Sequence, residues 1–206
     1  MPQQTTWRGQ PATKFRKEPI LGVIAITAAA VGNLLTQGQT YSALVDDVGE
    51  FAAGGRTVVD YAQTITKGTI PTGVAYDVHG LFANITIGGL ASVLTEAQLN
   101  ALAHNTVVII HHQGQRYNMG RLSGWLGPTN TATQRVGNIV GFRKFQEAFE
   151  LAPGDKFKVE LRQLNNITGG VVASAVYNVD IELDATTYLL GAAAIVVSVA
   201  IAWLLL

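Results

Sequence analysis

The side chains that most often carry out chemistry are few and scattered in this chain. It has no cysteine, and its histidines are His79, His104, His111 and His112. His111 and His112 are adjacent, so on a strand they point to opposite faces and cannot bind one metal ion together. His104 falls in the last turn of a predicted helix, where a cation is modestly favoured. We therefore expect no metal site, and the lack of cysteine excludes disulfides and thiol nucleophiles.

The carboxylates and the serines show no catalytic pattern. Asp46, Asp47 and Glu50 are close in sequence, but adjacent carboxylates on a helix face different ways, which favours a solvated face. Gly124 directly follows Ser123, so the Gly-x-Ser-x-Gly elbow of hydrolases is absent. No glycine-rich phosphate-binding motif occurs. We predict that the protein is not an enzyme and has no catalytic residue, cofactor or small-molecule substrate.

The middle of the chain is typical of a β protein. Alternation is cleanest at 156–161 and 178–184, where every second side chain is apolar, as a half-buried strand requires. The turn signal Pro153-Gly154-Asp155 precedes the first of these. Further β-rich runs cover 58–59, 74–78, 82–87, 107–111 and 176–183.

One helix is predicted at 95–105. Thr95 can cap its start, Gln98 stands where a capping-box partner belongs, and Asn105 suits its end. Together with the strands, this helix predicts a mainly β fold, an antiparallel β-sandwich with one short inserted helix. Trp125, beside Gly124, either anchors a subunit interface or closes one end of the sandwich.

Composition and the end of the chain point to a membrane. Of all residues, 48% are hydrophobic and only 14% are charged, which excludes a wholly disordered chain. The run 188–206 has no charge and, as a helix, would extend about 28 Å against a hydrocarbon core of about 30 Å. Its ten Leu, Ile and Val residues favour insertion by roughly 3–6 kcal/mol. We predict a transmembrane helix whose membrane-spanning residues are Tyr188, Leu189, Leu190, Ile195, Val196, Val197, Val199, Ile201, Trp203, Leu204, Leu205 and Leu206.

The first residues are basic. Arg8, Lys14, Arg16 and Lys17 occur without an acidic neighbour in residues 1–17, so we predict an extended arm that contacts anionic lipid or nucleic acid. The balance of 14 Lys and Arg against 14 Asp and Glu argues against nucleic-acid binding by the whole surface.

An apolar run follows at 20–31, too short for a full crossing. It has features of a signal peptide or of a second span, and we favour a helix on or in the bilayer surface. A further helix is predicted at 44–51. The chain thus divides into a basic extended arm (1–19), an apolar and helical connector (20–56), the β-sandwich (57–185) and the transmembrane helix (186–206).

Segment 149–161, FELAPGDKFKVEL, followed by a closing strand of alternating charge, resembles the jelly-roll capsid proteins of icosahedral viruses. The basic arm and the membrane helix are similar to features of capsid or capsid-associated proteins in viruses with an internal membrane, such as bacteriophages of the tectivirus and corticovirus type. The resemblance covers roughly residues 70–206. The β region is long enough for one jelly roll and too short for the double roll common among the major capsid proteins of that lineage.

The resemblance implies a structural virion protein, a membrane-anchored capsid subunit that assembles laterally into an icosahedral shell around a lipid membrane. Its implied partners are further copies of itself, other capsid subunits, lipid and, through the arm, nucleic acid. One alternative is a cellular membrane-tethered β-sandwich that binds a ligand. Another is a small viral membrane protein for lysis or genome entry, which requires a second span at 20–31.

Overall fold

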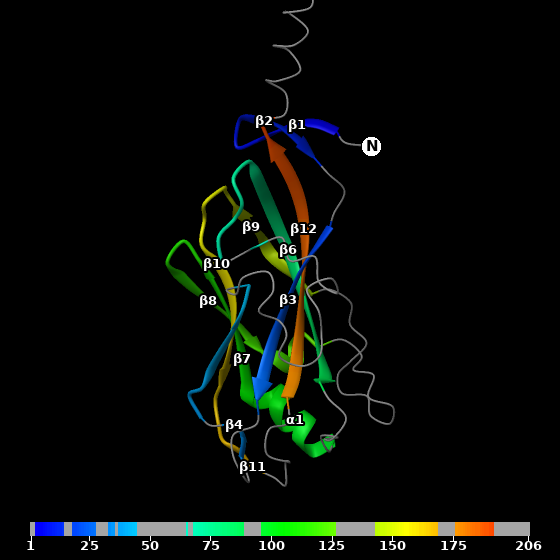
Figure 1. Ribbon diagram of the computed structural model, residues 1–206, viewed down its shortest axis with the longest axis vertical. Helices are drawn as coiled ribbons and strands as arrows, with labels where there is room; N and C mark the ends of the chain where they lie inside the picture. Colours follow the sequence, from blue (N-terminus) through cyan, green and yellow to red (C-terminus); the bar gives the residue numbers. More distant parts are fainter. Residues whose placement is uncertain are drawn as a thin grey trace, which may run out of the picture.

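The protein is mainly β, with antiparallel sheets and one short helix in the part that the structure describes (Figure 1). The structure is a computed structural model, and it describes residues 3–14, 18–27, 33–35, 37–44, 65, 68–88, 96–126, 143–168 and 176–191. Two sheets enclose a common hydrophobic core, which makes the fold sandwich-like.

The larger sheet is built around β12 (Val176–Leu190). Its strand order is β1-β2-β12-β6-β9, and β3 also pairs with β12. β3 occupies one edge of β12 over residues 176–185, and β2 continues along 188–190. The other strands of this sheet are β1 (Gln3–Trp7), β2 (Gln10–Lys14), β3 (Glu18–Thr27), β6 (Val74–Gly88) and β9 (Arg143–Leu151).

The smaller sheet has the order β5-β10-β7-β8. Its strands are β5 (Thr40–Ala43), β7 (Thr106–His112), β8 (Gln115–Arg121) and β10 (Phe157–Gln163). A separate small pairing joins β4 (Asn33–Leu35) to β11 (Ile167–Thr168).

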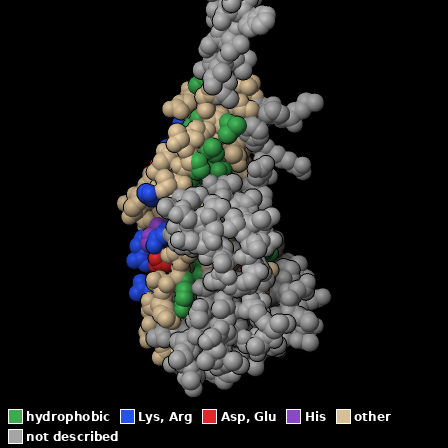
Figure 2. Space-filling model, viewed as in Figure 1, with side chains coloured by type: hydrophobic (Ala, Val, Ile, Leu, Met, Phe, Trp, Pro, Cys, Tyr) green, Lys and Arg blue, Asp and Glu red, His purple; other side chains and the backbone are tan. Residues whose placement is uncertain are grey.

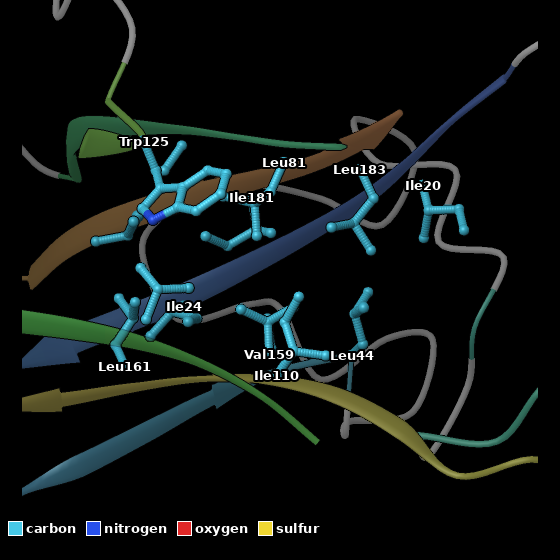
Figure 3. Close-up of a cluster of buried hydrophobic side chains, with 14 of the residues drawn as sticks. Ile20, Ile24, Leu44, Leu81, Ile110, Trp125, Val159, Leu161, Ile181 and Leu183 are labelled. Carbon is cyan, nitrogen blue, oxygen red and sulfur yellow. The ribbon is translucent and has the colours of Figure 1, made fainter. Parts of the chain in front are cut away.

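The core lies between the two sheets, as Figure 3 shows. In β10, Phe157, Val159 and Leu161 point inward and are at most 1% exposed. In β12, the same is true of Ile181 and Leu183. The predicted alternation in both strands is therefore confirmed. The two strands belong to different sheets, and their inward side chains pack in the same core.

The predicted helix is confirmed as α1 (Glu96–Asn105). It buries Leu102 and Ala103 and lies next to the 3-10 turn Leu122–Gly124. Trp125 follows that turn, is 7% exposed and packs in the core cluster, and its Nε1 donates a hydrogen bond to the Met119 carbonyl oxygen at 3.0 Å.

Residues 74–78 and 82–87, predicted as two strands, form one continuous strand, β6. Gly80 lies between the two predicted runs, where the pairing of β6 with β12 contains a bulge. Asp184 pairs with Gly80, and the next residue of β12, Ala185, pairs with Val78. His79 is the extra residue at this bulge.

The helix predicted at 20–31 is not present in the described residues, because Glu18–Thr27 is strand β3. Its ten residues pair in register with β12, and Ile20 and Ile24 enter the core. Gly22 faces inward between them, and a Cβ there would lie 2.8 Å from Leu44 Cδ2. A short unbroken apolar run fits a buried strand as well as a helix, so periodicity alone misjudged it.

Residues 3–14, predicted as part of an extended arm, form a hairpin of β1 and β2. Trp7 pairs with Gln10, so Arg8 and Gly9 make the turn, and both have positive φ, as a type I′ turn requires. The hairpin is joined to the sheet through β2 and β12, and it lies at one end of the long axis of the molecule (Figure 1).

Tyr188, Leu189 and Leu190, predicted as the start of the membrane helix, belong to β12. Within the part of the chain that the structure describes, no helix has the length and apolarity that a bilayer crossing requires. The other predicted membrane residues lie outside the described residues, as do Arg16, Lys17, the acidic group at 46–50, most of the helix predicted at 44–51 and the strand at 58–59.

Candidate functional surface

The outer face of the smaller sheet carries a concentration of charge. Strand register places Lys158, His111 and Arg116 side by side in one row across β10, β7 and β8. A parallel row holds Arg162, Val107 and Arg121. Figure 2 shows basic and histidine side chains gathered at mid-height on one flank. We call this surface the basic face and define it by Arg116, Arg121, Lys158 and Arg162.

Glu160 is the carboxylate within the basic face. It lies on β10 between Lys158 and Arg162 and is only 7% exposed. Its carboxylate oxygens lie 3.2 Å from Lys158 Nζ and 3.9 Å from Arg116 Nη2. A buried carboxylate needs such partners, because desolvation without them costs several kcal/mol.

His111 adds a titratable group to this cluster. Its Nε2 lies 3.1 Å from Glu160 Oε2, but the two atoms are not aligned for a hydrogen bond. Burial lowers the pKa of His111 below its ordinary 6.5, and the nearby charges of Lys158 and Arg116 lower it further, while Glu160 opposes them. The neutral imidazole is therefore favoured in the folded protein. Because the unfolded chain binds this proton more readily, the group destabilises the fold as pH falls below about 6.5.

We predict that Glu160→Gln lowers the pKa of His111 further and destabilises the protein by about 1–3 kcal/mol. The substitution keeps the shape of the side chain but removes the charge that attracts the imidazolium and pairs with Lys158. NMR titration of the His111 ring in both proteins checks the first effect, and urea unfolding checks the second. His104, on α1, is the internal control. A higher His111 pKa in the variant would show that Glu160 is not its main attractive partner.

Beside the cluster the basic face is hollowed. A depression of about 540 Å³ lies between Arg116 and Arg162. Val107 and Ile109 line it, and both are buried although they lie outside the core cluster. An apolar floor flanked by two guanidinium groups suits an anionic side chain or a phosphate, since guanidinium groups bind both with paired hydrogen bonds.

Arg8, one of the four cations predicted to lie in an extended arm, instead forms an ion pair with the β domain. Its Nε lies 2.7 Å from Glu150 Oε2, and its guanidinium stands 4.9 Å from the centre of the Trp7 ring. Lys14 is exposed on β2 opposite Tyr188. The structure therefore places Lys14 beside Tyr188 and holds Arg8 in the turn at the other end of the same hairpin.

Asp77 fixes this hairpin. Trp7 Nε1 donates a hydrogen bond to Asp77 Oδ1 at 3.0 Å, and the Tyr188 hydroxyl donates to Oδ2 at 2.9 Å. Trp7, Ala12 and Ala75 form a small hydrophobic cluster around this contact, with Tyr188 packed against it. Nothing in the sequence indicated that Asp77 joins two aromatic residues from opposite ends of the chain, because the pairing depends on strand register.

The histidines lie in separate places. His111 and His112 point to opposite faces as predicted, His112 lying near Phe157 with its Nε2 3.4 Å from Asp155 Oδ2. His79 Nε2 lies 3.1 Å from Thr186 Oγ1. Among the described residues, no three His, Cys, Asp or Glu side chains group as metal ligands would. Asp155 accepts a hydrogen bond from the Ala152 amide at 2.8 Å, in the turn predicted before β10.

A second hollow, missed in the sequence, separates the edge strands β8 and β9. It measures about 1070 Å³ and is lined by aromatic and charged side chains. Phe149 is central there, with ring centres 5.0 Å from Tyr117 and 5.2 Å from Phe145. The spacing of Phe145 and Phe149 in the sequence did not suggest this hollow, because the pairing of β9 with β6 is irregular between Phe149 and Lys144. We call this hollow the aromatic cleft.

No known protein family, curated protein or solved structure matches this chain. The features of the molecule that bear on its function are therefore the strand order, the charged surfaces and the apolar end of the sequence. The basic face is the best defined of these surfaces, because its four cations come from two strands of one sheet, β8 and β10, and a buried carboxylate lies among them.

Proposed function

We propose that this protein is a structural subunit of a virion: a single jelly-roll domain, tethered to a lipid membrane, that assembles laterally into a shell. The supporting observation is the order of eight strands. Taken along the chain, β3, β5, β6, β7, β8, β9, β10 and β12 divide into the sheets β3-β12-β6-β9 and β5-β10-β7-β8. Two four-stranded antiparallel sheets linked in this way are the pattern of a jelly roll, which is frequent in viral capsids.

The interior supports a shell-forming role. Bulky aliphatic and aromatic side chains such as Leu44, Leu81, Ile110 and Trp125 fill the space between the sheets (Figure 3). A barrel filled in this way offers its outer surfaces, rather than its interior, for interactions.

The membrane tether is proposed from the sequence after Gly191. Because residues 188–190 are in β12, the remaining apolar run 192–206 would extend only about 22 Å as a helix. A run shorter than the hydrocarbon core is accommodated by local thinning of the bilayer or by insertion from one side. Confinement to a membrane raises the effective concentration of subunits, so that weak lateral contacts suffice for assembly.

Removing residues 192–206 should abolish membrane attachment without unfolding the β domain. We expect the full chain to float with lipid vesicles on a density gradient and the shortened chain to remain at the bottom. The thermal unfolding midpoint of the shortened chain should stay within a few degrees, because β12 is left complete to Leu190. Flotation of both proteins to the same density would remove the tail from the proposal.

Imaging tests the assembly itself. The full chain, reconstituted with lipid, should form closed or ordered shells that contain a bilayer. A uniform distribution of single subunits on the vesicles at high surface density would contradict the proposed shell.

The second candidate is a membrane-tethered ligand-binding module, favoured by the aromatic cleft. A cleft of about 1070 Å³ lined by aromatic side chains has the size and composition of many ligand sites. In that case Tyr117→Ala should weaken ligand binding without affecting any assembly. The third function, lysis or genome entry, needed a second span at 20–31, and Glu18–Thr27 is instead paired along its length with β12.

A further inference from the structure

The aromatic cleft contains an exposed ring. Among the described residues, the exposed large hydrophobic side chains are Tyr117, at 40%, and Leu164, at 36%. Tyr117 lines the cleft, where its ring meets that of Phe149 edge-on. An exposed ring inside a hollow offers a flat apolar surface that a ligand can cover.

The rings of the cleft form one continuous wall. The planes of Phe145 and Phe149 meet at 84° with ring centres 5.2 Å apart, and those of Tyr117 and Phe149 meet at 77°. Trp125 continues the series, with its ring centre 5.8 Å from that of Phe145. At these distances neighbouring rings touch, so no methylammonium group fits between them as it does in an aromatic cage. The wall instead suits a ligand that lies along it.

Polar side chains with unused hydrogen-bonding capacity surround this wall. Gln146 and Glu147, in the middle of β9, are exposed, and neither side chain has a hydrogen bond or an ion pair among the described residues. Gln113 donates through Nε2 to Asp155 Oδ2, which leaves its carbonyl oxygen as an acceptor. Amide groups donate and accept, and a carboxylate accepts, so this set matches hydroxyl groups, which also do both.

The charges that line the cleft are balanced. Arg8 and Glu150 pair with each other at 2.7 Å, and Arg116 lies 3.9 Å from the buried carboxylate of the basic face. Lys144 and Glu147 remain without an ion-pair partner among the described residues, one of each sign. An anion would be repelled by Glu147 and a cation by Lys144, and a wholly apolar ligand would desolvate both without new partners. The lining therefore favours a neutral ligand rich in polar groups.

We propose that the aromatic cleft binds a neutral oligosaccharide. The C–H groups on one face of a pyranose ring pack on Tyr117, because the face of an aromatic ring carries partial negative charge. The hydroxyl groups at the edge of the sugar bond with Gln146 and Glu147. At about 1070 Å³, the cleft is at the upper end of the usual size of ligand sites, about 300–1,000 Å³, so it accommodates several sugar units.

This binding goes beyond the proposed shell and does not require it. On a virion, the cleft would attach the shell to a surface that carries such sugars. In a membrane-tethered binding module, the same cleft would take the same class of ligand.

Saturation-transfer NMR tests the proposal with the full chain reconstituted in phosphatidylcholine vesicles. The probes are four neutral sugars, maltohexaose, cellohexaose, mannohexaose and chitohexaose, each at millimolar concentration. We expect at least one of them to bind. Saturation of the aromatic protons of the protein should then pass mainly to C–H protons on one face of the sugar ring.

Variants locate the binding. Tyr117→Ala should weaken it at least about tenfold, whereas Tyr117→Phe, which keeps the ring, should weaken it at most about threefold. Gln146→Ala combined with Glu147→Ala should weaken it about fivefold or more, through lost hydrogen bonds. Since both positions are exposed, this double variant keeps the test valid if Tyr117→Ala disturbs the packing of Phe149. Leu164→Ala is the matched control, because Leu164 is exposed to a similar degree and lies outside the cleft.

Several outcomes overturn the inference. These are the binding of none of the four sugars, and wild-type binding by both Tyr117→Ala and the double variant. Stronger binding of a heparin hexasaccharide would make the cleft an anion site, and stronger binding of hexaproline would make an extended peptide its occupant. Shell formation is judged separately by imaging, so sugar binding without shells would leave this inference standing and remove the proposed function. Shells without sugar binding would do the reverse.

Discussion

Replacing Phe157 by alanine should lower the free energy of unfolding by about 3–5 kcal/mol, the largest effect on stability that we expect from a single substitution. Phe157 is 1% exposed and is among the largest fully buried side chains of the described core. Its ring makes edge contacts with Phe149 and His112, with centres 6.5 Å and 6.3 Å apart. Removing it leaves a cavity between two sheets whose backbone pairing prevents collapse.

Urea unfolding followed by circular dichroism measures this effect. Leu164→Ala is the matched control, because Leu164 is 36% exposed and loses little contact when it is truncated. We expect the control to change stability by no more than about 0.5 kcal/mol. A loss for Phe157→Ala no greater than that of the control would mean that the two sheets do not enclose this ring.

The elements that could be predicted from the sequence are those with a strong local pattern. β10 and β12 each alternate between buried and outward side chains, and the sequence around α1 carries a predicted start signal and a predicted end signal. In contrast, β8 is exposed along nearly its whole length, so hydrophobic alternation gave no signal for it. The prediction for β3 was wrong for a different reason, because an unbroken apolar run has no periodicity that distinguishes a strand from a helix.

The basic face likewise combines features that a local sequence pattern predicts with features that it does not. Alternation around 156–161 placed Lys158 and Glu160 on the outward face, which is correct. It could not show that Glu160 would be buried, because His111 and Arg116 reach it from other strands through pairing registers set by the whole sheet. Which strands lie in which sheet is a long-range property that the sequence pattern does not contain.

The amino-terminal hairpin shows how a polar, basic sequence can become part of the domain. Arg8 and Gly9 form a turn in which both residues have positive φ, and an Arg-Gly pair is not among the Asn-Gly, Asp-Gly and Gly-Gly pairs that mark such a turn in a sequence. Once β2 pairs with β12, Arg8 meets Glu150, and the charge that suggested a free arm serves to fix the hairpin.

Asp77→Ala should release this hairpin, with a loss of about 1–3 kcal/mol in the free energy that keeps it docked. The substitution leaves Trp7 Nε1 and the Tyr188 hydroxyl without their acceptor. Hydrogen exchange of the β1 and β2 amides should accelerate, while β7 and β10 in the smaller sheet keep their protection. Trp7→Phe is the matched comparison, because it removes one donor and retains an aromatic ring.

The same variant has a signature at high pH. Burial raises the pKa of Tyr188 to about 12, with further contributions from the hydrogen bond and the charge of Asp77 and from Glu150. Because the folded value lies above the unfolded value near 10, this stabilisation is complete below pH 10 and is lost as pH rises through about 12. In Asp77→Ala the Tyr188 pKa should fall towards 10, which ultraviolet titration at the phenolate band detects as earlier ionisation of one tyrosine. An unchanged titration, together with unchanged exchange in β1 and β2, would show that the hairpin is held by β2–β12 pairing and Arg8 without Asp77.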